Sequence, residues 1–461
     1  MMITLLTRLV TATRRLFDLL NTSQMLVLGF GAIIFTGTFL LMLPMASTGT
    51  PLHFIDALFT ATSATCVTGL IVLDTGSAFT HFGQGVILGL IQIGGLGIMT
   101  ISTFLLYLFQ GRLSLSSRGL LEETLSQSPV QHLKALLKTV FLATITIEGV
   151  GALLLSLRFM MDMPWNRAIY YGVFHSISAF CNAGFALYSD SFIRYQDDLL
   201  INFTISSLII IGGIGFIVLY ELNQFRLKQI SRLSLHTRLV LITTLVLIVG
   251  GAIFFLVLEM NSSLAGYPWS SRIDIALFQS LTTRTAGFNT IDLRQLSNPT
   301  LYIMIILMLI GASPGSCGGG MKTTTFAVLL FFIKAKFYNQ QSVNVFQRRI
   351  PPGAVSKAVT VAFFSFALIS VITMLLLITE LSGIPHQQSR GLFLEMLFEV
   401  TSAFGTVGLS LGVTPTLTNL GRLLITFMMF VGRLGPLTLA LAVGSRETTH
   451  FYYAKEDVLI G

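Results

Sequence analysis

Four glycine-bearing segments carry the chemistry that this sequence suggests. In each, a short apolar stretch runs into a glycine set among small or polar residues, and a long hydrophobic stretch follows. Backbone carbonyls from such a segment can replace the hydration shell of a cation. Glycine permits the backbone angles that turn successive carbonyls toward one axis, and it leaves the narrow point free of a side chain. The candidate ion-filter residues are Val67, Thr68, Gly69, Asn182, Ala183, Gly184, Thr285, Ala286, Gly287, Thr406, Val407 and Gly408.

The spacing within the four segments is nearly constant. A phenylalanine precedes the glycine by ten residues in three segments and by one residue less in the third. A second glycine follows the first after 25, 28, 24 and 24 residues, at Gly94, Gly212, Gly311 and Gly432. Glycine is common in membrane helices for packing alone, so a single copy would be weak support. The fourfold register instead indicates a unit repeated around one pore axis.

A glycine-rich interruption of the sixth hydrophobic stretch suggests a gate. The run Gly311–Lys322 (GASPGSCGGGMK) contains a proline and five glycines, so it cannot stay a regular helix. Irregular backbone at membrane depth must be buried in protein or line water. Arg433 lies beside Gly432, and we expect carbonyls of this run, or the Ser313 and Ser316 hydroxyls, to hold its guanidinium. The candidate gate residues are Gly311, Ser313, Pro314, Gly315, Ser316, Gly318, Gly319, Gly320, Lys322 and Arg433.

Two other kinds of site fit this run less well. A phosphate loop has a lysine directly after its last glycine, but a methionine precedes Lys322 and no strand is evident before the run. An intramembrane serine protease would use Ser313 or Ser316 with a histidine such as His175, but no helix pair presents that histidine to those serines. Both alternatives are therefore disfavoured.

Two further charged residues, Arg284 and Glu148, lie in or near the hydrophobic stretches. Arg284 directly precedes the third filter segment, and we expect it to brace the preceding helix rather than contact an ion. Glu148 has no identifiable partner in the sequence, so an ion-path role and a packing or snorkelling role both stay open. Arg433 has a packing alternative as well, in which its removal would lower both expression and flux.

The composition indicates a membrane protein. Hydrophobic residues make up 53% of the 461 residues and charged residues only 10%. The four glycine-bearing segments have apolar parts of only about ten residues, too short to cross a membrane, and are predicted to be re-entrant helices. Eight other stretches are long enough to cross, namely Gln24–Leu43, Gly85–Phe109, Thr139–Leu157, Leu199–Tyr220, Val240–Leu258, Leu301–Ile333, Val359–Thr379 and Leu420–Val443.

The expected fold is an all-α membrane protein with four repeats around one pseudo-fourfold pore. Each repeat comprises a transmembrane helix, a re-entrant pore helix with its filter loop, and a second transmembrane helix. The repeats share one orientation, which disfavours a symporter built from inverted repeats. The predicted units are a cytoplasmic amphipathic tail at 1–23, pore repeats at 24–110, 139–222, 239–335 and 358–444, a gate loop at 311–322 and a cytoplasmic tail at 445–461.

The distribution of positive charge predicts the orientation. Outside the eight stretches, 18 lysines and arginines lie on the side of the two termini and 7 lie on the side of the glycine-bearing segments. The positive-inside rule then places both termini in the cytoplasm, in a multi-pass protein of the plasma (inner) membrane. The N-terminal stretch lacks a small-residue cleavage site, so we expect no cleaved signal peptide. The net charge of +8 thus reflects orientation and not nucleic-acid binding.

The motifs resemble a known family. The segments TCVTGL, FCNAGF, TRTAGFNT and FGTVGL, the run GASPGSCGGGMKTTT and the segment GRLGPLTLA are similar to those of the Trk/Ktr/HKT superfamily of potassium-translocating membrane subunits. The resemblance covers nearly the whole chain. The chain begins only a short way before its first hydrophobic stretch, and in this it is most like the bacterial Ktr-type (KtrB-like) subunit. Plant-type members often replace the first filter glycine by serine and then favour sodium, whereas this chain has Gly69.

The resemblance implies a transport protein rather than an enzyme. It implies potassium uptake through a channel-like pore, with K⁺ held at the filter residues and the gate loop lying in the pore below them. It also implies a homodimer in membrane lipid, regulated by a cytosolic nucleotide-binding ring (KtrA-like), with no cofactor bound by this chain. A sodium-permeable or sodium-coupled cation transporter of the same superfamily stays open as the alternative. Three scattered cysteines, Cys66, Cys181 and Cys317, indicate neither a disulfide framework nor a zinc site.

Overall fold

The computed structural model describes residues 22–97 and 133–443. The predicted tail 445–461, nearly all of the tail 1–23 and the last part of the stretch Gly85–Phe109 lie outside these residues. Within the described residues, four consecutive repeats each contain a long outer helix, a short pore helix and an inner helix that ends or breaks at a glycine. This arrangement confirms the predicted fold class.

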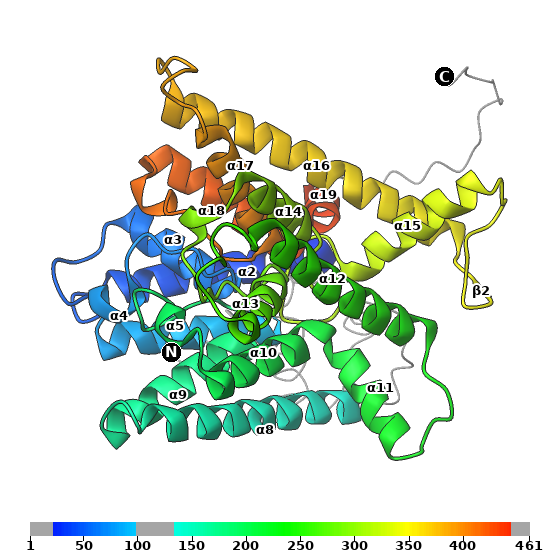
Figure 1. Cartoon of the computed structure of the whole chain (residues 1–461), viewed down its shortest axis with the longest axis horizontal. Coiled ribbons are helices and arrows are strands. Elements are labelled where there is room, and N and C mark those ends of the chain that lie inside the picture. The colour runs from blue at the N-terminus through cyan, green and yellow to red at the C-terminus, as the bar shows by residue number, and fades with distance from the viewer. Residues whose placement is uncertain (1–21, 98–132, 444–461) are drawn as a thin grey trace, which may run out of the picture.

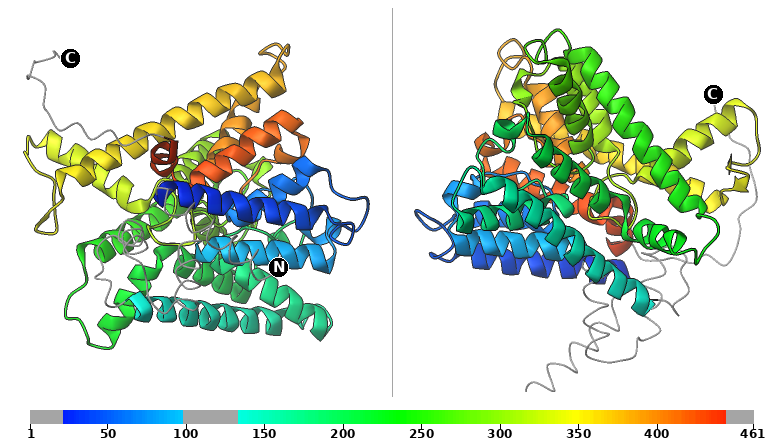
Figure 2. Two further views of the ribbon diagram at one scale, coloured as in Figure 1. Left: turned by 180° about the vertical axis from the view of Figure 1, so that it is seen from behind. Right: turned by 60° about the horizontal axis from the view of Figure 1, so that its bottom comes forward.

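The four outer helices are long and apolar enough to cross a membrane. Large apolar side chains remain exposed along all four of them, for example Phe35, Leu142, Phe254 and Phe366. Lipid solvates such side chains as readily as a protein core does, so these helices form a wall that faces lipid. In Figure 1, the second lies along the bottom of the molecule and the fourth along the top, and Figure 2 shows the first from behind. Their bounds are Thr22–Met42 (α2), Leu133–Phe159 (α8), Leu235–Glu259 (α12) and Pro352–Leu381 (α16).

The four pore helices are short and largely buried. Each of them ends at most two residues short of one of the predicted filter segments, and the last two turns of each are almost entirely buried. At 1.5 Å per residue, none of them is long enough to cross the roughly 30 Å hydrocarbon core, as expected of re-entrant helices. They are α3 (Phe54–Thr65), α9 (Trp165–Phe180), α13 (Trp269–Thr282) and α17 (Leu392–Gly405).

The inner helices are not the uninterrupted spans that the sequence predicts. Helices α10 (Leu199–Ile214) and α11 (Phe216–Arg226) meet at an angle of 98°, and α18 (Asn419–Leu434) and α19 (Pro436–Val443) meet at 93°. The glycine between each pair has a positive φ, +104° at Gly215 and +85° at Gly435. A left-handed residue cannot continue a right-handed helix, so the second half turns aside.

The other two inner helices also end near their second glycine. Helix α5 (His81–Leu96) ends at Gly97, which has a φ of +81°. In the third repeat, the predicted span Leu301–Ile333 is divided into α14 (Asn298–Leu309) and α15 (Thr323–Phe337), with the gate loop, residues 311–322, between them. The sequence therefore predicted the loss of helical structure in the third repeat, but not the ends or breaks at Gly97, Gly215 and Gly435.

The repeats pack head to tail into a closed ring. The inner helix of each repeat packs against the pore helix of the next, in the pairs α5–α9, α10–α13 and α14–α17, and α18 packs back against α3. An ion pair joins the last repeat to the first, with Arg422 Nη1 2.6 Å from Asp56 Oδ1. A head-to-tail contact that returns to its start generates rotational symmetry, here within one chain.

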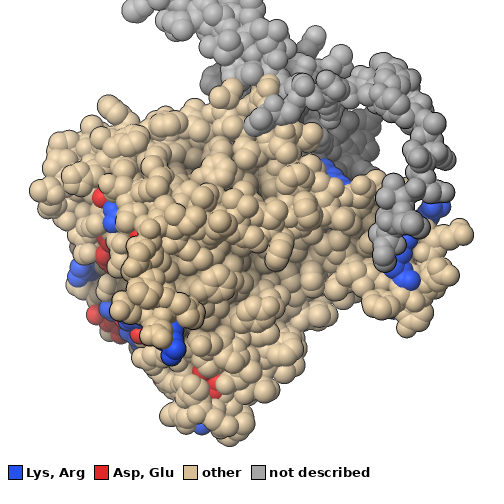
Figure 3. All heavy atoms as spheres, turned by 90° about the horizontal axis from the view of Figure 1, so that it is seen from above, with Lys and Arg blue, Asp and Glu red and all other residues tan. Residues whose placement is uncertain are grey.

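The remaining elements are short and lie at the two ends of the long helices. Helix α15 and the hairpin after it project beyond the helical body in Figure 1. Figure 3 shows few charged side chains across the middle of the face seen from above, and charged groups gathered toward its edges. Such an uncharged band fits a membrane. The short elements are α4 (Thr75–Ala78), η2 (Ile193–Tyr195), η3 (Leu293–Gln295), η4 (Thr414–Thr416), β1 (Asn344–Val345) and β2 (Arg348–Arg349), the last two pairing antiparallel.

Candidate ion filter and gate

The four filter glycines lie against one another in a closed ring. Each glycine approaches the carbonyl oxygen of the residue that precedes the next filter glycine, and the fourth approaches the first segment in the same way. A contact below 3.0 Å leaves no room for a Cβ atom. A Cβ atom built on Gly69, Gly184, Gly287 or Gly408 would lie 2.4, 3.0, 2.6 or 2.0 Å from the carbonyl oxygen of Ala183, Ala286, Val407 or Thr68, respectively.

The backbone of each filter segment alternates in handedness. The first residue has a positive φ in all four segments, although none is glycine, and the third residue, the glycine, also has a positive φ. A non-glycine residue in this conformation costs about 1–3 kcal/mol and persists only where its surroundings impose it. Such alternation aligns successive peptide groups, with the N–H groups on one side and the carbonyls on the other. The φ values of the first residues are +57° (Val67), +59° (Asn182), +70° (Thr285) and +51° (Thr406).

The N–H groups of the filter point back to the pore helices. In each segment the middle residue donates its N–H to a carbonyl in the last turns of the preceding helix, over 2.7 to 3.0 Å, as Thr68 does to Ser63. None of the twelve filter carbonyl oxygens accepts a hydrogen bond from a described residue. Eleven of the twelve residues are buried, and the twelfth, Gly184, is partly exposed. Buried carbonyls are normally paired, so this concentration of unpaired oxygens marks a site for a positively charged ligand.

Hydroxyl groups hold the filter segments, a feature that the sequence reasoning missed. The Oγ of Ser63 donates to the Leu70 carbonyl over 2.7 Å and accepts from the Gly69 N–H over 3.1 Å. Ser178, Thr282 and Ser402 make one of these two bonds in the other repeats. A signal was present, because a Ser-Ala pair begins six residues before the filter glycine in three segments and the third has a threonine five residues before it.

The gate loop lies against the start of the filter segments. The Gly319 N–H donates to the Thr406 Oγ1 over 2.9 Å. A Cβ atom on Gly318 would lie 2.1 Å from the Thr285 Oγ1, and one on Gly319 would lie 2.5 Å from the Thr406 Oγ1. Thr285 and Thr406 are the first residues of the third and fourth filter segments, so the loop approaches the ring at that end, and the approach is close enough to require glycine.

The gate loop also uses carbonyls that the broken inner helices leave free. The Ser313 and Cys317 N–H groups donate to the Gly213 and Gly212 carbonyls over 3.1 and 3.2 Å. The Gly320 N–H donates to the Gly432 carbonyl over 3.1 Å. A helix that ends leaves its last carbonyls without intrahelical donors, and the loop supplies these donors. The second glycines of the repeats thus anchor a loop contributed by the third repeat.

Arg433 binds the gate loop through a backbone carbonyl, one of the two kinds of acceptor that we expected. Its Nη1 donates to the carbonyl of Cys317 in the loop, and its Nη2 donates to the carbonyl of Gly94 in the first repeat. The Ser313 and Ser316 hydroxyls, the other acceptors that we considered, bond within the third repeat. The Ser316 Oγ donates to the Ser313 carbonyl over 2.6 Å, and the Ser313 Oγ accepts from the Thr323 hydroxyl.

A second cation lies within the gate loop. The Lys322 Nζ donates to the Gly318 carbonyl over 2.6 Å. Neither Lys322 nor Arg433 forms an ion pair with a carboxylate among the described residues. The Arg433 guanidinium, next to the start of the filter and without a counter-ion among the described residues, raises the electrostatic energy of any other cation that reaches this point.

The structure also places the two remaining charged residues. The Arg284 Nη2 lies 3.4 Å from the Thr244 Oγ1 on α12, so the guanidinium is directed to the outer helix and away from the ring. Both carboxylate oxygens of Glu148 accept from the Gln92 Nε2, over 3.1 and 3.2 Å. Gln92 is 56 residues away in the sequence, which is why the sequence alone did not identify it.

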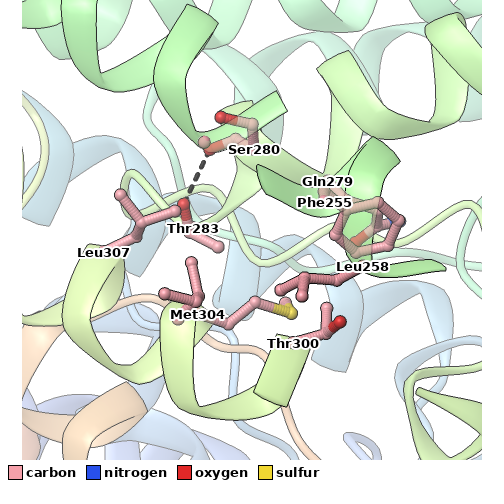
Figure 4. Close-up of a pocket in the computed structure, with 10 residues that line it drawn as sticks. Phe255, Leu258, Gln279, Ser280, Thr283, Thr300, Met304 and Leu307 are labelled. Atoms are coloured by element: carbon pink, nitrogen blue, oxygen red, sulfur yellow. Dashed lines mark hydrogen bonds between the residues drawn. The ribbon is translucent and has the colours of Figure 1, made fainter. Parts of the chain in front are cut away.

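A small hollow between α12, α13 and α14 lies apart from the ring. Figure 4 shows that apolar side chains such as Phe255 and Met304 line most of it, together with the hydroxyls of Ser280 and Thr283. The Thr283 hydroxyl already donates to the Ser280 carbonyl over 2.6 Å. No filter or gate residue lines this hollow, so it is not part of the candidate ion path.

Comparison with known proteins agrees with this geometry. The TrkH family model, described as cation transport protein, matches residues 3–447. The chain is 40% identical to Ktr system potassium uptake protein B of Vibrio alginolyticus over 444 residues, which cover 95% of this chain and 94% of that protein. It is 40% identical to the protein of the same name from Bacillus subtilis over 440 residues, covering 95% of this chain and 96% of that protein.

Two further comparisons extend this result. The potassium/sodium uptake protein NtpJ of Enterococcus hirae is 37% identical over 457 residues, which cover 97% of this chain and 99% of that protein. The crystal structure of the potassium transporter TrkH from Vibrio parahaemolyticus has the same fold, with a TM-score of 0.70 and 17% identity over 93% of this chain and 86% of that chain. The resemblance inferred from the sequence motifs is confirmed. The chain belongs to the TrkH family of cation transport proteins, a family of membrane transporters and not of enzymes.

Proposed function

We propose that this chain takes up potassium across the plasma membrane through the ring of filter carbonyls. The observation that carries the proposal is the set of twelve filter carbonyls, gathered around one ring and left without donors among the described residues. Four segments with alternating handedness supply oxygens in layers, as a dehydrating cation requires. The chain itself holds no cofactor in this proposal, and the electrochemical gradient drives the ion inward.

Potassium is favoured over sodium as the transported ion. All four segments retain glycine at the ring, and the relatives from Vibrio alginolyticus and Bacillus subtilis are named as potassium uptake proteins. The name of the Enterococcus hirae relative includes sodium as well as potassium, so sodium permeation or sodium coupling is the second candidate. The two differ in a measurable way, because a potassium filter discriminates against sodium whatever the driving gradient.

The gate loop and Arg433 together form the proposed gate. The loop approaches the filter through Gly318 and Gly319, while Arg433 ties it to the first repeat through the carbonyl of Gly94. An ion leaving the filter would meet this loop and two cations, Lys322 and Arg433. Opening therefore requires the loop to leave the carbonyls of the inner helices, with Arg433 following or releasing it.

The proposal also assigns an orientation and partners. Both termini lie in the cytoplasm, and the filter opens to the outside between the loops that follow the outer helices. The basic residues after α11 and in and after α15, such as Lys228, Lys334 and Lys336, then face the cytoplasm, where a nucleotide-binding regulatory ring would bind two copies of this chain. The relatives are named as protein B of a Ktr system, which supports a partner subunit.

Flux measurements on the purified chain test the proposal. In liposomes loaded with potassium, the wild-type protein should accumulate ⁸⁶Rb⁺, a potassium substitute, and external potassium should suppress this uptake at lower concentration than sodium does. Gly287→Ser should raise the potassium concentration needed for half-maximal uptake, because a Cβ atom there would lie 2.6 Å from the Val407 carbonyl oxygen.

A matched control is Gly266→Ser, where a Cβ atom would meet nothing within 4 Å. This variant should transport like the wild type. Equal suppression by sodium and potassium would favour the sodium alternative. Kinetics unchanged in Gly287→Ser would remove this glycine from the filter.

A further inference from the structure

A buried polar residue occupies the same place in every pore helix. It lies nine residues before the filter glycine in the first, second and fourth repeats and eight residues before it in the shorter third repeat. Each of these side chains is at most 2% exposed. Their chemical types differ, whereas the filter itself is nearly the same in each repeat. The four residues are Thr60, His175, Gln279 and Glu399.

In the second and third repeats, this residue holds the far end of the filter. The His175 Nε2 accepts from the Leu187 N–H over 3.1 Å, and its Nδ1 lies 2.8 Å from the Tyr171 carbonyl oxygen. The Gln279 Nε2 donates to the Thr290 Oγ1 over 3.3 Å. Leu187 and Thr290 are each the third residue after their filter glycine. One brace thus connects the middle of the pore helix with the chain that leaves the filter.

The fourth repeat has the same brace with more hydrogen bonds. One carboxylate oxygen of Glu399 accepts from the Leu411 N–H over 3.1 Å and from the Ser410 hydroxyl. The other oxygen accepts from the Thr414 hydroxyl over 2.8 Å. Hydrogen bonds to a carboxylate are roughly twice as strong as those between neutral groups. In the first repeat, by contrast, the Thr60 hydroxyl donates only within its own helix, to the backbone carbonyl of Asp56.

We propose that Glu399 is a specificity-determining positioning residue for the ion filter. Its carboxylate fixes the backbone that follows Gly408, and so fixes the distance of the filter carbonyls from the axis. Discrimination between two cations of the same charge depends on oxygens that keep their spacing and number when a smaller ion arrives. This inference rests on the proposed cation function and adds a residue that does not touch the ion.

The variant Glu399→Gln tests the proposal with little change of shape. Glutamine has one acceptor oxygen. Its NH₂ group would face N–H or O–H groups that now donate hydrogen bonds to the carboxylate. We expect the preference for potassium over sodium to fall about tenfold, equivalent to about 1.4 kcal/mol, because a buried hydrogen-bonding partner is lost. The measurement is ⁸⁶Rb⁺ uptake in competition with sodium and with potassium, normalised to monodisperse protein.

A matched control is Glu395→Gln, the same chemical change one turn earlier on α17. This variant should keep the wild-type preference. If the preference stays at the wild-type value in folded Glu399→Gln, and only the melting temperature falls, then Glu399 is a structural residue and the proposal is wrong. Absence of cation flux in the wild type would instead contradict the proposed function.

A second variant keeps the test decisive if Glu399→Gln does not fold. Thr414→Val leaves the carboxylate in place and removes one of its donors at nearly constant volume. We expect the preference for potassium to fall about threefold, the effect of losing one such hydrogen bond. A folded Thr414→Val protein with the wild-type preference would overturn the proposal.

Discussion

The filter ring and the gate loop both depend on glycine, but they differ in symmetry. In the ring, each repeat contributes one glycine at an equivalent place, and every contact recurs around the axis. The gate loop comes from the third repeat alone, and its glycines allow it to approach threonines of the third and fourth filter segments. A cation site benefits from equal oxygens on all sides, whereas a gate needs one element that moves relative to the rest. In the proposed function, the symmetric ring binds the cation and the asymmetric loop controls its passage.

The strongest test of the symmetric region is to add a methyl group at each filter glycine. Gly408→Ala should lower flux about a hundredfold or more, since a backbone clash and a left-handed alanine each cost about 1–3 kcal/mol. A Cβ atom there would lie 2.0 Å from the Thr68 carbonyl oxygen, whereas the nearest atom for Gly184 is 2.9 Å away. Gly184→Ala should therefore be milder. The measurement is ⁸⁶Rb⁺ uptake per folded molecule.

The control for this series is Gly353→Ala, near the start of α16, where a Cβ atom would meet nothing within 4 Å. It should leave flux unchanged. If Gly408→Ala transported like this control, the ring would not be the narrow part of the pore.

The asymmetric region predicts a change of the opposite sign. Arg433→Ala should raise flux about tenfold, equivalent to about 1.4 kcal/mol, because it removes a positive charge and frees the carbonyls of Cys317 and Gly94. The preference for potassium should stay the same, since the filter is untouched. Deleting several residues of the gate loop should have the same two effects.

Arg422→Ala, on the same helix, is the control for Arg433. It breaks the ion pair with Asp56 and should lower stability without raising flux. If Arg433→Ala lowers expression and flux in the same way, then Arg433 holds the helices together and does not hold the gate.

Two native thiols allow the movement of the gate loop to be tested reversibly. Cys181, which precedes the second filter segment, and Cys317 in the gate loop lie near each other. The Cys317 N–H donates to the Gly212 carbonyl, and Gly212 packs against Phe180, the residue before Cys181. Oxidation to a disulfide with copper phenanthroline should lower flux about fivefold by fixing the loop, and a reductant should restore it. Cys317→Ser should be insensitive to both reagents. A disulfide that forms, as shown by mass spectrometry, without changing flux would contradict movement of the loop at this point.

The smallest predicted effect concerns the hydroxyls that hold the filter. Ser178→Ala removes the bond to the Phe185 carbonyl and should raise the potassium concentration for half-maximal uptake about threefold. Ser176→Ala is the matched control, because the Ser176 hydroxyl donates to the Glu148 carbonyl on the outer helix. The two variants should differ in affinity for potassium, and equal affinities would show that the hydroxyl does not support the filter.

The sequence predicted the parts of the fold that depend on local residues. The pore helices and filter segments follow from apolar length, from glycine and from the regular spacing, all of which lie within about 30 residues of one another. The gate loop followed from proline and glycine within one hydrophobic stretch. Membership of the family followed from the same motifs.

The sequence could not predict contacts that depend on how the repeats meet. The bond of Arg433 to the Gly94 carbonyl, the Gln92–Glu148 pair and the ion pair of Arg422 with Asp56 each join different repeats. Several acceptors of similar chemistry were available to each donor, and only the packing selects among them. The bends of the inner helices were missed for another reason, since a glycine in a helix permits a left-handed residue without requiring one.

Locating the bound ion is the decisive test of the proposed ion filter. Crystals of the protein grown in rubidium and measured at the rubidium absorption edge would show the ion by its anomalous scattering. We expect a peak on the axis of the ring, within coordination distance of carbonyl oxygens from all four filter segments. A peak elsewhere, with none in the ring at saturating rubidium, would contradict the claim that these four glycine segments form the ion filter.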